Sequence, residues 1–306
     1  MSYTTKVKEE IIKKILAKSE SIAQLSGFVR NNAHIGDNIT LTTENINIAN
    51  KAINVFKDLY EVEVKKEIKT NLNFSKKDLY LLTIEDKKDL ILKDLGIYDD
   101  NNNYLDTPPE YMLDSTEEIK AYLRGVFLAS GSINDPKTSR YHLELHIEKP
   151  KEAVFVQKLL NLFDLNIKML TRDRVYMLYL KDSEKISDYL KILDASNAVM
   201  YFENIRIYRD KMNQANRLNN CEQANMDKVV STATKQLEYI EIIEDNMGVS
   251  LLDDKTKEAL EYRKKYPESS LKELSEIITL ETGNKITKSG LNHRFRKIKD
   301  LATKFK

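Results

Sequence analysis

The sequence predicts an α+β protein, in which a duplicated body of helices and strands is followed by a smaller all-α domain. Three observations support this fold class. A segment that begins at residue 23 recurs at residue 121, and the same order of elements follows each copy. After residue 250 only helical patterns remain. Basic residues concentrate at the C-terminal end. The predicted domains are the body over 1–200, an Asn- and Arg-rich linker over 201–226 and the helical domain over 227–306.

Composition narrows the class of protein. The chain has 306 residues, of which 41% are hydrophobic, so it is able to bury a sizeable core. It contains no apolar run of the roughly 20 residues that a membrane span needs, and the first residues lack a signal-peptide pattern. The single cysteine, Cys221, excludes an intramolecular disulfide and a cysteine-based zinc site. We therefore expect a cytoplasmic protein.

The first repeat covers about residues 1–100. Apolar spacing predicts helices over 3–18, 22–31 and 45–60, and alternation predicts strands over 39–41, 62–64 and 78–84. A short helix over 87–95 is predicted to end at Gly96. The resulting order after the first helix is helix, strand, helix, strand, strand, helix.

The second repeat covers about residues 110–200 and follows a polar loop that ends in Pro108 and Pro109. Ser115 or Thr116 is predicted to cap its first helix. A strand over 141–147, a helix over 150–164, strands over 167–169 and 175–180 and a helix over 183–193 follow. Because the order matches the first repeat, we expect a pseudo-two-fold body whose two sheets form a saddle.

Small residues mark the predicted contact between the two repeats. Ala23 and Gly27 in the first repeat correspond to Ala121 and Gly125 in the second. Small side chains four residues apart lie on one helix face and let another backbone come close, whereas a glycine inside a helix otherwise costs about 1 kcal/mol relative to alanine. These four residues therefore predict a close helix–helix interface.

The C-terminal region predicts a helix-turn-helix. Helical patterns cover 227–245, 254–265, 271–278 and 289–304, and a turn lies at Gly283. The segment Lys285–Lys306 contains eight Lys and Arg and one acid, Asp300, and so carries +7, while residues 1–284 carry −6 of the total of +1. A basic second helix suits a DNA duplex. The alternative is a solvated basic helix without a ligand.

The start of that second helix predicts the residues that contact double-stranded DNA. Arg and Lys read guanine and Asn reads adenine through paired hydrogen bonds, whereas further cations contact phosphates. The predicted DNA-binding residues are Lys285, Thr287, Lys288, Ser289, Asn292, His293, Arg294, Arg296, Lys297 and Lys299.

A metal site is not expected. His142, Glu144 and His146 share one face of a predicted strand at a spacing that metal ligands also use. The opposite face is apolar, so this face is the solvated one. We predict neither a metal nor another cofactor.

The duplicated helix resembles the LAGLIDADG motif of homing endonucleases, at residues 25–33 and 123–131. In that family two such helices pack at the two-fold axis, and each ends in an acid that holds a divalent metal. Asn32 and Ser130 stand at these acidic positions. A neutral amide and a hydroxyl cannot neutralise the cations. The resemblance therefore implies the fold without the nuclease. Arg124 departs from the family's small residue. The alternative is an unrelated duplicated fold.

Nearly the whole chain resembles the WhiA family of bacterial transcriptional regulators. Asn216–Asn225 resembles the family's linker and Thr287–Ile298 its recognition helix. The resemblance implies sequence-specific DNA binding, a nucleoid-associated location, no catalysis, and a link to cell division, chromosome segregation or sporulation. It implies double-stranded DNA as partner, with transcription or division proteins left open, and neither a membrane nor a small-molecule substrate.

Two alternatives stay open. The first is a metal-dependent endonuclease with relocated carboxylates, for which Asp37, Glu44 and Asp135 lie near the motif ends. The second is a scaffold that recruits division or transcription partners through the saddle. Strong DNA affinity of the acidic body would require basic residues to gather on its concave face. The candidates are Lys65, Lys66, Lys168, Arg172 and Arg174.

Overall fold

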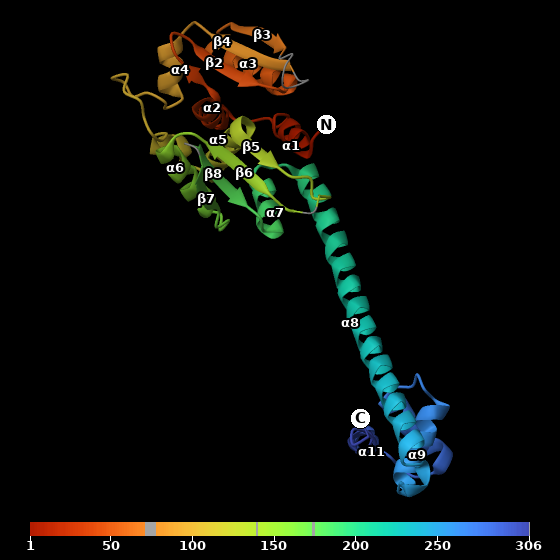
Figure 1. Ribbon diagram of the computed structural model, residues 1–306. Helices are drawn as coiled ribbons and strands as arrows, with labels where there is room; N and C mark the ends of the chain where they lie inside the picture. Colours follow the sequence, from red (N-terminus) through yellow and green to blue (C-terminus); the bar gives the residue numbers. More distant parts are fainter. Residues whose placement is uncertain (71–77, 139, 173–174, 306) are drawn as a thin grey trace. The chain divides into compact units, whose positions relative to one another are not determined.

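The computed structural model describes residues 1–70, 78–138, 140–172 and 175–305 (Figure 1). The chain divides into two compact units, Met1–Arg209 and Asp210–Lys306. The first unit is a mixture of helices and antiparallel sheets, and in the second unit every described element is helical. The predicted fold class is therefore confirmed.

The first half of unit 1 forms a four-stranded antiparallel sheet in the order β1-β2-β4-β3. In β2, Ile39 and Leu41 are buried and alternate with half-buried threonines, so one face of the sheet packs on the core. The elements are α1 (Tyr3–Ile11), α2 (Lys18–Asn32), β1 (His34–Ile35), β2 (Ile39–Thr43), α3 (Ile46–Tyr60), β3 (Val64–Thr70), β4 (Asp78–Ile84) and α4 (Lys88–Asp94).

The second half repeats this topology. Its antiparallel sheet has the order β5-β6-β8-β7, which is the order of the first sheet shifted by four strands. The predicted duplication is thus present, although the short strands β1 and β5 were not expected. The elements are η1 (Glu110–Leu113), α5 (Thr116–Ser130), β5 (Gly131–Ile133), β6 (Leu143–Ile147), α6 (Pro150–Asn161), β7 (Lys168–Arg172), β8 (Val175–Leu180) and α7 (Ser183–Ile192).

Helices α2 and α5 lie side by side at the centre of unit 1 (Figure 1). A Cβ atom added to Gly27 would lie 2.3 Å from the carbonyl oxygen of Tyr122, and one added to Gly125 would lie 2.0 Å from that of Gln24. The two backbones are therefore in direct contact, which only glycine permits at these positions. Ala23 and Ala121 are fully buried in the same core.

Arg124 does not prevent this contact, although it is large and fully buried. Its guanidinium donates to Asp194 at 2.6 Å and to Glu20 at 3.5 Å. Lys14 also pairs with Asp194. The buried charge thus has two carboxylate partners, which a buried charge requires in order to be tolerated.

The residues that were expected to form a linker, 201–226, lie inside one long helix, α8 (Ser196–Asn246). No glycine or proline interrupts this segment. Its amide and charged side chains are compatible with a helix. Residues 210–228 are exposed throughout. The helix is therefore solvated on all sides over this stretch, a pattern that periodicity alone does not reveal.

Unit 2 packs three helices against the end of α8. They are α9 (Asp254–Lys265), α10 (Leu271–Thr282) and α11 (Lys288–Ala302), with a 3₁₀ turn η2 (Val249–Leu251). Ile243, Leu274, Ile278, Leu291 and Ile298 form the centre of its core. In the described residues no helix combines the length and apolar character that crossing a membrane requires.

Candidate nucleic-acid interface

Helices α10 and α11 are joined by a short turn and form the predicted helix-turn-helix. Gly283 ends α10 in the left-handed conformation, with φ of 73°. Thr287 caps α11, because its hydroxyl accepts the N–H of Gly290 at 3.1 Å. Lys285 is exposed within the turn. Thr287 therefore positions the first turn of α11.

The two faces of α11 differ sharply. Leu291, Phe295, Ile298 and Ala302 are buried at helical spacing against the core of unit 2. The exposed side presents polar and basic side chains, of which only Asn292 is half-buried. This basic face consists of Lys288, Ser289, Asn292, His293, Arg296 and Lys299.

The basic face has the form that direct base readout needs. Lys288, Asn292, Arg296 and Lys299 follow one another at steps of four, four and three residues, which places them along one side of the helix. A helix fits the major groove, and the side chains near its N-terminus reach the base edges. None of the ion pairs within the described residues includes Arg296, so its guanidinium is available to a ligand.

Arg294 and Lys297 lie on a different side of α11. Arg294 donates to the Glu258 carboxylate at 2.6 Å and to the Lys255 carbonyl at 3.0 Å, both in α9. Lys297 forms an ion pair with Asp253 and thereby lowers the pKa of that carboxyl. Both cations hold α11 against the start of α9. Sequence periodicity did not separate them from the basic face.

In unit 1, the side chains at the two positions that would carry catalytic acids are hydrogen-bonded to backbone groups of other residues. The Asn32 amide donates to the Thr42 carbonyl at 2.8 Å and accepts the Thr42 N–H at 2.9 Å, and so fixes β2 to the end of α2. The Ser130 hydroxyl donates to the Val126 carbonyl at 3.2 Å. The Asn32 side chain is therefore engaged with β2, and the Ser130 hydroxyl with the preceding turn of α5.

A carboxylate that the sequence did not single out, Glu152, lies beside the end of α2. It accepts hydrogen bonds from the Tyr122 hydroxyl and, at 3.3 Å, from the Asn31 amide, and Arg30 lies 3.8 Å away. Burial raises the pKa of Glu152. A single buried carboxylate in such a network serves to hold α6 against α2 and α5.

The proposed alternative carboxylates do not converge. Asp37 is exposed, and Asp135 accepts hydrogen bonds from the Lys137 N–H and the Tyr201 hydroxyl. Glu44 lies near Lys8, where burial lowers the pKa of the lysine and Glu44 opposes that shift in part. Over the described ranges, no group of three or more His, Cys, Asp or Glu is placed to hold a metal ion.

On β6, Glu144 bridges the two neighbouring histidines. His142 lies 2.9 Å and His146 3.5 Å from its carboxylate oxygens. Leu143, Leu145 and Ile147 alternate with these residues and are buried. The alternation shows that the histidine face is the solvent side of the sheet.

The basic residues that were expected to gather on a concave face do not all lie on the same face of their sheets. Lys65 pairs in register with Thr83 on the open face of the first sheet, but its ammonium binds Glu85 at 2.6 Å. Lys66 pairs in register with the buried Leu82, so it lies on the opposite face. Lys168 and Arg172 occupy the open face of the second sheet. Arg174 lies outside the described residues.

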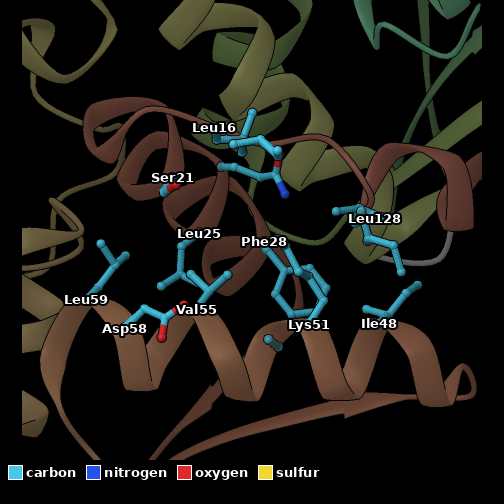
Figure 2. A pocket seen from close by; sticks show the side chains of 14 residues that line it. Leu16, Ser21, Leu25, Phe28, Ile48, Lys51, Val55, Asp58, Leu59 and Leu128 are labelled. Carbon is cyan, nitrogen blue, oxygen red and sulfur yellow. The ribbon is translucent and has the colours of Figure 1, made fainter.

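Unit 1 also contains an apolar cavity of about 220 Å³ between α2, α3 and the segment that joins α1 to α2 (Figure 2). Leu16, Leu25, Phe28 and Val55 contribute to its wall. Asp58 is the one carboxylate among the lining residues, and neither Asn32 nor Ser130 contributes to it. The cavity therefore lacks the paired acids of a nuclease centre.

Comparisons with known proteins cover both units. A model of the WhiA N-terminal LAGLIDADG-like domain matches residues 18–98, and a model of the WhiA LAGLIDADG-like domain matches residues 119–212. A model of the WhiA C-terminal HTH domain matches residues 215–302. The three matches follow the order of the two repeats and the helix-turn-helix.

Similar proteins extend over the full length. A protein of Pediococcus pentosaceus described as "Probable cell division protein WhiA" is 37% identical over 311 residues, which is 100% of both chains. A Bacillus cereus protein of the same description is also 37% identical and covers 100% of this chain and 98% of its own.

Solved structures show the same fold. The crystal structure of full-length DUF199/WhiA from Thermatoga maritima matches with a TM-score of 0.60 at 21% identity, over 100% of this chain and 99% of that one. The crystal structure of the N-terminal LAGLIDADG domain of DUF199/WhiA matches with a TM-score of 0.50 at 20% identity, over 62% of this chain and 89% of that one. The LAGLIDADG-like body is thereby confirmed.

Proposed function

The chain belongs to the WhiA family, and on this premise we propose that it is a sequence-specific DNA-binding protein that regulates transcription in cell division, chromosome segregation or sporulation. The observation that carries the proposal is the exposed basic face of α11. This face combines a base-reading Arg, Asn and Lys at helical spacing with a helix-turn-helix that has its own core. Its ligand is double-stranded DNA, and its location is the cytoplasm, at the nucleoid.

Within the proposed interface, the residues have different tasks. Lys288, Asn292 and Arg296 are the base-reading residues, with Ser289 and His293 beside them. Lys285 and Lys299 contact phosphates, which position the helix without specifying a sequence. The structure supports a different task for Arg294 and Lys297, because their ion pairs with α9 fix the angle at which α11 is presented.

We also propose that the body has no nuclease activity. Asn32 and Ser130 bring no negative charge to the helix ends, and both are already hydrogen-bonded to the backbone. Divalent cations that cleave phosphodiesters need carboxylates to fix them. In this proposal residues 1–200 form a framework that is available to division or transcription proteins. Residues 201–226 link this framework to residues 227–306, which bind DNA.

Binding of the full chain to duplexes tests the proposal. Duplexes selected from a random pool serve as the specific site, and scrambled duplexes serve as the reference. We expect Arg296→Ala to weaken specific binding by about 1–3 kcal/mol. Arg296→Lys is the matched control for charge, because lysine keeps the cation but loses the planar fork that reads guanine. It should lose sequence preference while it keeps the salt dependence.

Two outcomes would contradict the proposal. If both Arg296 variants keep the wild-type preference among duplexes, α11 is not the reading helix. If the wild-type chain nicks supercoiled plasmid with magnesium, and if this activity disappears on changing Asp37, Glu44 or Asp135, the chain is instead an endonuclease. We expect no nicking.

A further inference from the structure

Unit 2 contains a second cationic feature, a cavity of about 220 Å³ at the N-terminal end of α10. Helices α8, α9, α10 and α11 all contribute to its lining, together with the turn between α9 and α10. Four of the lining residues are cationic and none is acidic. The cationic lining residues are Lys228, Arg263, Lys272 and Lys288.

Arg263 is the decisive residue, because it is fully buried and has no carboxylate partner within the described part of the chain. Its Nε donates to the Gln236 side chain at 3.0 Å, and one terminal nitrogen donates to the Ser269 carbonyl at 2.6 Å. The same nitrogen also reaches the carbonyls of Tyr266 and Pro267. The other terminal nitrogen is buried without any hydrogen-bond partner.

Among the described residues, no carboxylate neutralises this buried positive charge. The aromatic ring of Phe295, 5.5 Å from the guanidinium carbon, is its other electrostatic neighbour. Desolvation lowers the pKa of Arg263, and no carboxylate opposes that effect. A buried charge without a counterion is strongly unfavourable, so an anion that enters the cavity would relieve it.

The free N–H groups at the start of α10 and the nearby lysines also favour an anion, whereas the neighbouring Glu273 carboxylate does not. The first N–H groups of α10, those of Leu271 and Lys272, have no acceptor within the helix and lie at its positive end. The Ser270 hydroxyl is occupied, since it accepts the Glu273 N–H, and the Glu273 carboxylate accepts the Ser270 N–H. Lys272 lies 4.0 Å from the Glu276 carboxylate, and its charge also acts on the neighbouring Glu273. Lys228 and Lys288 are exposed at the rim.

We propose that this cavity is an anion site that holds a phosphate group. The site joins the N-terminus of α10 to two lysines, Lys228 and Lys272, and to a buried guanidinium, which together match the charge and the acceptor oxygens of phosphate. Lys288 lies at the border between this site and the basic face of α11. We therefore expect the phosphate to be one of the DNA backbone, an assignment that rests on the proposed function, whereas the anion site itself does not.

The test uses the full chain and two double variants of equal charge. Lys228→Gln with Lys272→Gln removes two cations from the rim of the cavity. Lys264→Gln with Lys265→Gln removes two cations that pair with Glu244 and Glu281 and that do not line it. Inorganic phosphate is titrated at constant ionic strength against chloride, and the amide NMR signals of residues 269–272 are followed.

In the wild-type chain, phosphate should shift these signals to saturation, and chloride should not. The variant at Lys228 and Lys272 should bind phosphate about tenfold more weakly, whereas the control should bind like the wild type. The proposal is overturned if phosphate acts no differently from chloride on the wild type. It is equally overturned if the rim variant responds like the wild type.

A second measurement identifies the source of the phosphate. The dependence of DNA affinity on salt concentration gives the number of phosphates that the protein neutralises. If the group belongs to the DNA backbone, the slope of the rim variant should decrease in magnitude by about one relative to the control. If the slope is unchanged while phosphate binding is lost, the site serves a free phosphorylated molecule. A chain that binds no DNA would refute the proposed function, but the phosphate titration would still decide this site.

Discussion

At the scale of single residues, Lys8 shows how the fold perturbs a charge that looks ordinary in the sequence. Its ammonium donates to the Leu128 carbonyl, at the end of α5, at 3.0 Å and lies 5.7 Å from the centre of the Phe127 ring. Burial lowers the pKa of Lys8 to about 8, and Glu44 opposes the shift in part. The helical pattern of residues 3–18 gave no sign of this environment.

This pKa predicts how stability depends on pH. Between pH 8 and 10 the unfolded chain holds the Lys8 proton and the folded chain progressively loses it, so the contribution of Lys8 to stability rises with pH. Relative to Lys8→Met, the wild-type free energy of unfolding should increase by about 2 kcal/mol over this window. Urea unfolding of both proteins at pH 8, 9 and 10 measures the difference. A constant difference would show that Lys8 titrates normally.

Residue-scale contacts also decide which cations are available to a ligand. Arg294 and Arg296 are two residues apart and equally basic in the sequence, yet Arg294 binds Glu258 and Arg296 is exposed. Arg263 lies in a predicted helix and looks like a surface cation, but it is fully buried. Arg294 and Arg263 each bind a side chain more than 25 residues away, Glu258 and Gln236, and periodicity does not register such partners.

At the scale of elements, the pair α2 and α5 organises unit 1. Its sequence signature, small residues at a spacing of four, corresponds to backbone contact at Gly27 and Gly125. The signature was readable because helix faces follow from a fixed period. The hydrogen bond from Arg124 to Asp194 could not be predicted from this period, because Asp194 lies 70 residues further along the chain.

Adding one methyl group at this contact should therefore strongly destabilise unit 1. In Gly125→Ala the new Cβ would lie 2.0 Å from the Gln24 carbonyl oxygen and 2.8 Å from the Phe28 nitrogen, both backbone atoms that cannot move aside alone. We expect unit 1 to lose about 3 kcal/mol or more of stability. Urea unfolding followed by circular dichroism measures this loss.

Gly36→Ala is the matched control within the same unit. Its new Cβ would meet only the His34 ring, at 3.7 Å, which is an ordinary contact, so we expect a change near zero. If Gly125→Ala were as stable as this control, α2 and α5 would not be in backbone contact.

At the scale of the whole molecule, the described residues form two hydrophobic cores that share no residue. One extends from Tyr3 to Phe202, and the other is built from α8 to α11, beginning at Ile240. Each unit thus buries its own apolar surface, which is the requirement for independent folding.

Two cores predict two unfolding transitions. Gly125→Ala should lower only the transition of unit 1, whereas Leu291→Ala, which removes a fully buried side chain, should lower only that of unit 2, by about 2–5 kcal/mol. Calorimetry of the full chain with each variant resolves the two. One cooperative transition that both variants shift equally would contradict independent units.

The sequence by itself determined the order of the longer helices and strands of the body, the duplication, the helix-turn-helix and the concentration of positive charge in its last helix. These follow from local periodicity, from turn residues and from the similarity of two segments, none of which needs a long-range partner. It did not determine the structure of polar stretches that lack apolar periodicity. Residues 201–226, which were expected to be a linker, are part of α8.

Only the tertiary structure decided what each polar group does. It joined Asn32 to Thr42 by hydrogen bonds and paired Arg294 with α9. It also buried Arg263 in the lining of a cavity, without a carboxylate partner among the described residues. The physical reason is that the availability of a charge or a hydrogen-bond group depends on burial and on partners that only folding brings within about 3 Å.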